Sequence, residues 1–89
     1  MRFAVVCKDK AGHLDTRIAN RAAHLAYIEA TGVVEMAGPF LQDEQMCGSL
    51  VILGCENLEA ANAWVAGDPY GKAGLFESVT VQEWKKVIG

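Results

Sequence analysis

A row of basic side chains in the first half of the chain is the feature best suited to chemistry. Arg17, Arg21 and His24 follow one another by four and three residues, which places them on one face of a helix. Neither arginine has an acidic residue three or four positions away, so their mutual repulsion is uncompensated within the helix. An acid from elsewhere in the fold or an anionic ligand would compensate it, although two solvated arginines are the simpler interpretation.

The stretch GDPYGKAGLF, residues 67–76, contains the candidate acid. Asp68 precedes Pro69, which disfavours helical backbone at Asp68 and predicts that the preceding helix ends there, with Gly67 as its C-cap. Because proline fixes its own φ, the Asp68 carboxylate is expected to stand on a stiff bend. Asp-Pro is also a common turn starter, in which the carboxylate bonds only its own backbone.

His24 and Asp68 together would suit proton transfer. An imidazole titrates near neutral pH, so His24 could act first as a general base and then as an acid. Asp68 would hold the ring in one tautomer and stabilise the imidazolium. Arg21, with Arg17, would attract a carboxylate or phenolate. In the alternative interpretation, the His–Asp pair only ties the second helix to the first.

Two hydroxyl groups are further candidates for substrate binding. Ser49 and Tyr70 could line a pocket, or they could be satisfied inside the fold. The chain has no GxSxG, P-loop or GxGxxG motif and no metal-ligand spacing, so no cofactor and no metal are expected. Three cysteines without CxxC or Cys/His spacing are expected to be small apolar fillers in a reducing cytoplasm: Cys7, Cys47 and Cys55.

Four strands and two helices are predicted to position these residues. The first helix should begin at an N-cap of Asp15 or Thr16 and close at Gly32, and Asn57 should cap the second helix. The predicted strands cover residues 2–8, 33–37 (ended by Gly38-Pro39), 47–53 and 75–84, and the predicted helices run from 15 or 16 to 30 and from 58 to 66.

This order of elements, β-α-β-β-α-β, predicts a ferredoxin-like α+β fold. In that arrangement two helices cover one face of a four-stranded antiparallel sheet. The first helix should contact the sheet through apolar residues at three- and four-residue spacing, namely Ile18, Ala22, Leu25 and Ile28.

The predicted sheet is apolar on both faces. Phe3 and Val5 alternate with Ala4 and Val6 in the first strand, and the third strand repeats the pattern. Two helices can cover one face only, and an apolar sheet face is too large a patch to leave in water. A second copy packed sheet against sheet would bury it. The patterning therefore predicts a homodimer formed through the open sheet face.

Composition excludes several classes of partner. The chain has 89 residues, of which 52% are hydrophobic, enough for the core of one small domain. A net charge of −3 argues against a nucleic-acid-binding protein, which would show a basic stripe. No apolar run approaches the roughly 20 residues that span a bilayer. We therefore expect no nucleic-acid partner, no membrane partner and a cytoplasmic location.

An ordered set of short motifs resembles the YciI-like (YCII-related) family. Each motif is weak by itself, but the set covers nearly the whole chain in the right order. The motifs are RAAHL at 21–25, AGP at 37–39, GS at 48–49, LEAA at 58–61 followed by Trp64, DPY at 68–70 and AGL at 73–75.

The resemblance implies a single YCII-related domain, residues 1–89, with the fold of a dimeric α+β barrel. It also implies a His–Asp site, which corresponds to His24 and Asp68. Relatives in the same superfamily include muconolactone isomerase and a chlorinated-aromatic dehydrochlorinase. A lyase or isomerase acting on a small acidic or phenolic compound is thus the implied function. The alternative is a non-catalytic ligand-binding or accessory module.

Overall fold

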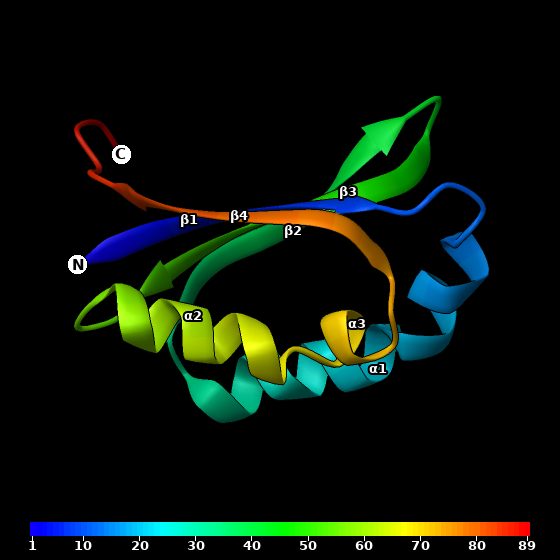
Figure 1. Ribbon diagram of the computed structural model, residues 1–89. Coiled ribbons are helices and arrows are strands. Elements are labelled where there is room, and N and C mark those ends of the chain that lie inside the picture. Colours follow the sequence, from blue (N-terminus) through cyan, green and yellow to red (C-terminus); the bar gives the residue numbers. More distant parts are fainter.

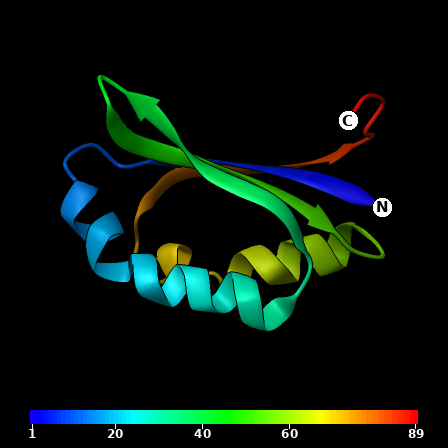
Figure 2. The same cartoon turned by 180° about the vertical axis from the view of Figure 1, so that it is seen from behind.

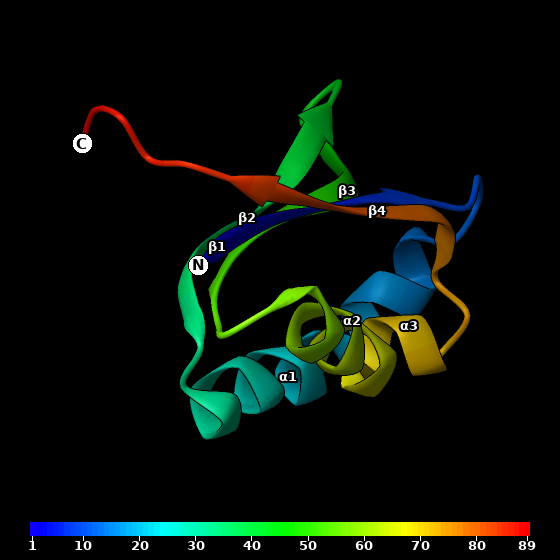
Figure 3. The same cartoon turned by 60° about the vertical axis from the view of Figure 1, so that its left-hand side comes forward.

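A four-stranded antiparallel sheet with its helices on one side forms the molecule (Figure 1 and Figure 3). The computed structural model describes all 89 residues. The strands lie in the order β2-β3-β1-β4, which confirms the predicted ferredoxin-like α+β fold. The elements are β1 (Arg2–Asp9), α1 (Leu14–Thr31), β2 (Val34–Gln42), β3 (Gln45–Gly54), α2 (Leu58–Gly67), α3 (Pro69–Lys72) and β4 (Phe76–Trp84).

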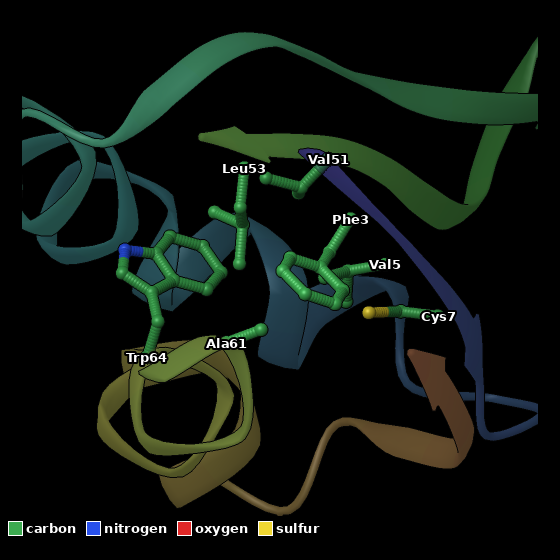
Figure 4. Packing of buried hydrophobic residues seen from close by; sticks show 7 residues of the cluster. All are labelled: Phe3, Val5, Cys7, Val51, Leu53, Ala61 and Trp64. Atoms are coloured by element: carbon green, nitrogen blue, oxygen red, sulfur yellow. The ribbon is translucent and has the colours of Figure 1, made fainter. Parts of the chain in front are cut away.

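The core lies between the sheet and the helices (Figure 4). Every second residue of β1 and β3 faces it, because side chains alternate between the two faces of a strand. Trp64 and Ala61 of α2 close the core from the other side. Its sheet residues are Phe3, Val5, Cys7, Val51 and Leu53. Burial above all, and then the negative charge of Asp68, raises the pKa of the Cys7 thiol to about 12.

The strand β2 is longer than predicted. It was expected to end before Gly38-Pro39, but it continues to Gln42, and Pro39 pairs with Ser49 of β3. The prediction was wrong because β2 is an edge strand. Proline lacks an N–H group and is tolerated at an edge, where one side of the strand needs no partner. The hairpin turn is correspondingly short, with positive φ at Asp43 and Glu44.

The helix α1 contacts the sheet through a different face from the predicted one. Ile18 and Leu25 were expected to face the core, yet they are 56% and 49% exposed, and only Ile28 packs against it. Arg17 and His24 are buried instead, at 2% and 6% exposure. Apolar spacing was misleading here because the buried polar groups find partners on other elements, which the helix sequence does not reveal.

The helix ends follow the sequence in part. Asn57 caps α2 as predicted, its side chain accepting a hydrogen bond from the backbone N–H of Ala60, and Gly32 closes α1 with a φ of 66°. The predicted side-chain cap at Asp15 or Thr16 is wrong, because α1 already begins after His13. The bend after α2 contains an unpredicted single turn, α3, where Pro69 occupies the first helical position.

The second face of the sheet has no helix over it (Figure 2). Val6 and Leu50 are exposed there, as the alternation of β1 and β3 predicted. Met36 and Phe40 of β2 are exposed beside them, and with Leu50 they line a shallow hollow of about 230 Å³. Both faces of the sheet therefore carry apolar side chains in the folded chain, as predicted.

Gly67 is required where α2 passes α1. A Cβ atom at this position would collide with the hydroxyl of Tyr27, which donates a hydrogen bond to the carbonyl of Trp64 at 2.7 Å. We expect Gly67→Ala to lower the free energy of unfolding by about 1–3 kcal/mol in urea denaturation, because a packed aromatic side chain must move. Gly71→Ala is the control, since its Cβ would meet nothing closer than 3.7 Å. Equal stability of the two variants would contradict this role of Gly67.

Candidate active site

His24 and Asp68 meet inside the fold. The Nδ1 atom of His24 lies 2.8 Å from Oδ1 of Asp68, and both side chains are buried. The same carboxylate oxygen accepts the backbone N–H of Tyr70 at 3.0 Å. Because a carboxylate accepts but does not donate hydrogen bonds, Nδ1 carries the proton in this contact. The Nε2 atom of a neutral His24 is then the ring's free acceptor.

The bend after α2 places the Asp68 carboxylate. Asp68 ends α2 and begins α3, with extended backbone at φ −64° and ψ 122°. Pro69 follows it in the first position of α3 and fixes that geometry. Gly67, predicted as the C-cap, is instead the last residue of α2. The stiff bend expected at Asp68 is thus present, and only the C-cap of α2 lies one residue later than expected.

Arg17 forms a buried ion pair with an acid, Asp9, that was not among the predicted site residues. Its Nε and Nη2 atoms donate to the two carboxylate oxygens of Asp9 at 2.7 and 2.8 Å, and Nη2 also donates to Ser49 Oγ at 2.8 Å. Burial opposes the charged guanidinium, but the hydrogen bonds and charge of Asp9 outweigh it and raise the pKa of Arg17. Arg17 therefore has an acidic partner, whereas no acidic side chain pairs with Arg21.

Asp9 is the residue of this site that motif reasoning missed. It was expected to open a loop, but it is the last residue of β1, beside a register shift between Lys8 and Asp9. A usable signal was present, since Asp9 continues the alternation of the helix-facing residues of this strand. Its position in this alternation directs its carboxylate toward the helices, where a buried carboxylate is stable only beside a cation.

Tyr70 packs against both Arg17 and His24. Its ring stacks on the imidazole of His24, with ring centroids 4.0 Å apart, and the Arg17 guanidinium carbon lies 4.6 Å from the Tyr70 centroid. Burial raises the pKa of the Tyr70 hydroxyl, although the charge of Arg17 and a hydrogen bond with it oppose the shift. Tyr70 is therefore a neutral hydroxyl at physiological pH.

A cavity of about 140 Å³ opens between α1 and the strands β2 and β3. All the predicted site residues except Asp68 line it, and Asp68 stands behind His24. The polar lining is Arg17, Arg21, His24, Ser49 and Tyr70, and the remaining wall is Leu25, Ile28, Ala37, Gly38, Pro39, Met46 and Val51. No aspartate or glutamate faces the cavity, so its free polar groups favour an anionic or oxygen-rich ligand.

Other parts of the surface lack a comparable arrangement. The largest hollow, about 600 Å³, lies near Arg2 and Glu35, whose side chains already pair with each other at 2.8 Å. No group of three or more His, Cys, Asp or Glu side chains could hold a metal ion. None of the helices combines the length and the apolar character needed to span a membrane.

Sequence comparison places this geometry in a known family. The YCII-related domain model matches residues 1–85. The chain is also 38% identical to Protein YciI of Escherichia coli O6:H1, over 99% of this chain and 100% of that protein. The chain belongs to the YCII-related family. In this member of the family, His24 of the RAAHL motif therefore contacts Asp68 of the DPY motif.

Two solved structures are similar to this YCII-related protein. One is 5-chloro-2-hydroxyhydroquinone dehydrochlorinase (TftG) from Burkholderia phenoliruptrix AC1100, in complex with 2,5-dihydroxybenzoquinone. It has a TM-score of 0.87 and 38% identity, over 96% of this chain and 94% of that one. The other is an antibiotic biosynthesis monooxygenase, with a TM-score of 0.57 and 8% identity, over 96% and 98% of the two chains. The second likeness shows the fold alone.

The buried pair between Asp9 and Arg17 should dominate the stability of the site. Asp9→Ala leaves a buried guanidinium without its carboxylate, so we expect the free energy of unfolding to fall by about 3–5 kcal/mol in urea denaturation. The control is Glu77→Ala, which removes the exposed pair with Lys8 at 3.4 Å and should cost less than about 1 kcal/mol. Similar losses for both variants would show that the Asp9–Arg17 pair is not buried as described.

Proposed function

We propose that this YCII-related protein is a small-molecule enzyme of the lyase or isomerase kind, related in chemistry to a dehydrochlorinase. The observation that supports the proposal is the buried contact between His24 Nδ1 and Asp68 at 2.8 Å beside a cavity. In this arrangement His24 acts as general base and then as general acid. Asp68 holds the tautomer and stabilises the imidazolium as it forms.

The charges around the cavity favour an anionic substrate. Asp9 compensates Arg17, and Asp68 faces His24, which leaves Arg21 as the cation without a carboxylate partner. Arg21 is exposed at the mouth of the cavity, where it can meet a carboxylate or phenolate. Ser49 and Tyr70 supply hydroxyl groups deeper in the same cavity. Arg17 contributes to binding from a fixed position.

The size of the cavity favours one ring. Its volume of about 140 Å³ is close to that of an engineered cavity of about 150 Å³ that accommodates benzene. The similar dehydrochlorinase TftG binds 2,5-dihydroxybenzoquinone, a single six-membered ring with oxygen substituents. A monocyclic acid or phenol is therefore the proposed substrate class for this protein.

Ligand binding is the direct test of this proposal. In calorimetric titration, we expect wild-type protein to bind both benzoate and 2,5-dihydroxybenzoquinone. Arg21→Gln should raise the Kd for both compounds by about 10-fold or more, because a hydrogen bond to a charged group is lost. Lys72→Gln removes an exposed cation outside the cavity and is the matched control.

The same titrations distinguish the proposed enzyme from the alternative. Absence of binding to either compound would contradict the proposed substrate class. Binding followed by no chemical change in any monocyclic phenol or acid would favour the non-catalytic binding or accessory module. In that case the contact between His24 and Asp68 would serve to tie α1 to the bend after α2.

We also propose that the protein is a homodimer packed through the open sheet face. Val6 and Leu50 are exposed on that face, and no helix lies over it (Figure 3). Membership of the YCII-related family, whose resemblance implies a dimeric α+β barrel, supports pairing of this face. A cytoplasmic location stays a prediction; the three cysteines are free, which suits a reducing compartment.

A charged substitution on the open face tests the dimer. Leu50→Glu should halve the mass measured by light scattering, because burying a carboxylate in an apolar interface is costly. Ala63→Glu, on the exposed side of α2, should leave the mass unchanged. A monomeric wild-type protein at micromolar concentration would overturn the proposal.

A further inference from the structure

Two buried polar groups keep hydrogen-bonding atoms in reserve at the cavity. His24 Nε2 forms no hydrogen bond within the chain. The guanidinium of Arg17 has five N–H donors, of which two bond Asp9, one bonds Ser49 and one bonds the Tyr70 hydroxyl. Both residues line the same cavity. The cavity is therefore where these atoms find partners.

The hydroxyl of Ser49 has a hydrogen that no hydrogen bond within the chain uses. Its Oγ accepts a hydrogen bond from Arg17 Nη2 at 2.8 Å. A guanidinium has no lone pair and cannot accept in return, so the hydroxyl hydrogen is free of this bond. Ser49 forms no other side-chain hydrogen bond, is buried and lines the cavity. Its hydrogen is thus available to a ligand oxygen.

Asp9 fixes this arrangement from outside the cavity. It holds Nε and Nη2 of Arg17 in a two-point contact, which sets the plane of the guanidinium. Two donors, Arg17 Nη1 and the Ser49 hydroxyl, are then oriented by one carboxylate that does not line the cavity. Asp9 acts through Arg17 and is a positioning residue.

Arg17 and His24 both contact the ring of Tyr70. The Arg17 guanidinium carbon is 4.6 Å from the centroid of Tyr70, and the His24 ring centroid is 4.0 Å from it. The two groups are therefore no farther apart than these two distances combined. Both also line the cavity together with Ser49, so a ligand there meets the donors and the imidazole in one site.

This pairing of an oxygen-binding subsite with a base is the arrangement that enolisation requires. We propose that the cavity catalyses proton abstraction from the carbon next to a carbonyl group of a monocyclic substrate, with Arg17 and Ser49 binding the oxygen. The proposal rests on the proposed function, because it uses His24 as the base. It adds the reaction class and the role of Asp9.

The step balances without any further reactant. His24 Nε2 takes the proton, and the electron pair of the C–H bond becomes the new carbon–carbon π bond. The carbonyl π pair moves onto oxygen, and the enolate oxygen receives the hydrogen bonds of Arg17 Nη1 and Ser49. Where the substrate has a carbon–carbon double bond conjugated with the enolate, return of the proton to the far carbon of that bond shifts the double bond and completes an isomerisation. Return of deuterium from heavy water to the same carbon completes an isotope exchange.

Isotope exchange tests enolisation without knowledge of the natural substrate. The probe is cyclohexane-1,4-dione in deuterated buffer, with exchange at its ring carbons followed by proton NMR. We expect wild-type protein to accelerate exchange with saturation in the probe, and His24→Asn to remove this acceleration. Asp15→Asn, an exposed acid at the start of α1, is the control and should exchange like wild type.

Variants of the oxygen-binding subsite separate catalysis from structure. Ser49→Ala should lower the saturated exchange rate on the order of 100-fold, with a much smaller change in KM, because the lost donor acts on the oxygen as its charge develops. Asp9→Asn should also lower the saturated exchange rate. Both variants are compared at a temperature where urea denaturation shows them to be folded, so a purely structural role would leave the rate unchanged.

The outcomes separate this inference from the proposed function. Wild-type protein that binds benzoate but does not accelerate exchange would overturn enolisation and leave the proposed binding site standing. Acceleration that survives Ser49→Ala and Asp9→Asn would overturn the oxygen-binding role of Arg17 and Ser49. Failure to bind either benzoate or 2,5-dihydroxybenzoquinone would remove the proposed substrate class and this inference together.

Discussion

The burial of charged and titratable groups on the inner face of α1 is the constraint on which the rest of the structure depends. A buried guanidinium costs several kcal/mol in lost hydration unless a carboxylate meets it with good geometry. Asp9 comes from the end of β1 and Asp68 from the bend after α2, so the partners lie on different elements. Satisfying both contacts therefore fixes α1 against the sheet and against α3.

The same compensation shapes the chemistry of the cavity. Asp9 and Asp68 stand behind Arg17 and His24, and neither carboxylate lines the cavity. The cavity therefore receives the donors of Arg17 and Ser49 and the free nitrogen of His24, with no carboxylate to repel an anion. Tyr70 packs against both Arg17 and His24 and, as a neutral hydroxyl, adds no charge of its own. Structural and chemical demands are met by the same contacts.

The open face of the sheet and the cavity meet at β2. Ala37, Gly38 and Pro39 line the cavity beside His24, and they also border the hollow that contains Met36, Phe40 and Leu50. A second copy on the open face would therefore pack next to a strand that forms one wall of the site. The stability of the small core and the shape of the cavity are linked through this edge strand.

Alternation along the strands, turn residues and the order of motifs were enough to determine the sheet, its two apolar faces, the α2 cap at Asn57 and the pairing of His24 with Asp68. These features depend on local spacing or on motifs that are read directly. Only the tertiary structure decided that Arg17 pairs with Asp9, that Ile18 and Leu25 stay about half exposed, and that β2 continues through Pro39. In the first two cases the deciding partner lies on another element. In the third, the edge of the sheet leaves one side of the strand without a partner. Spacing within a helix or strand fixes which residues share a face, but the energy of burying that face depends on what the fold brings against it.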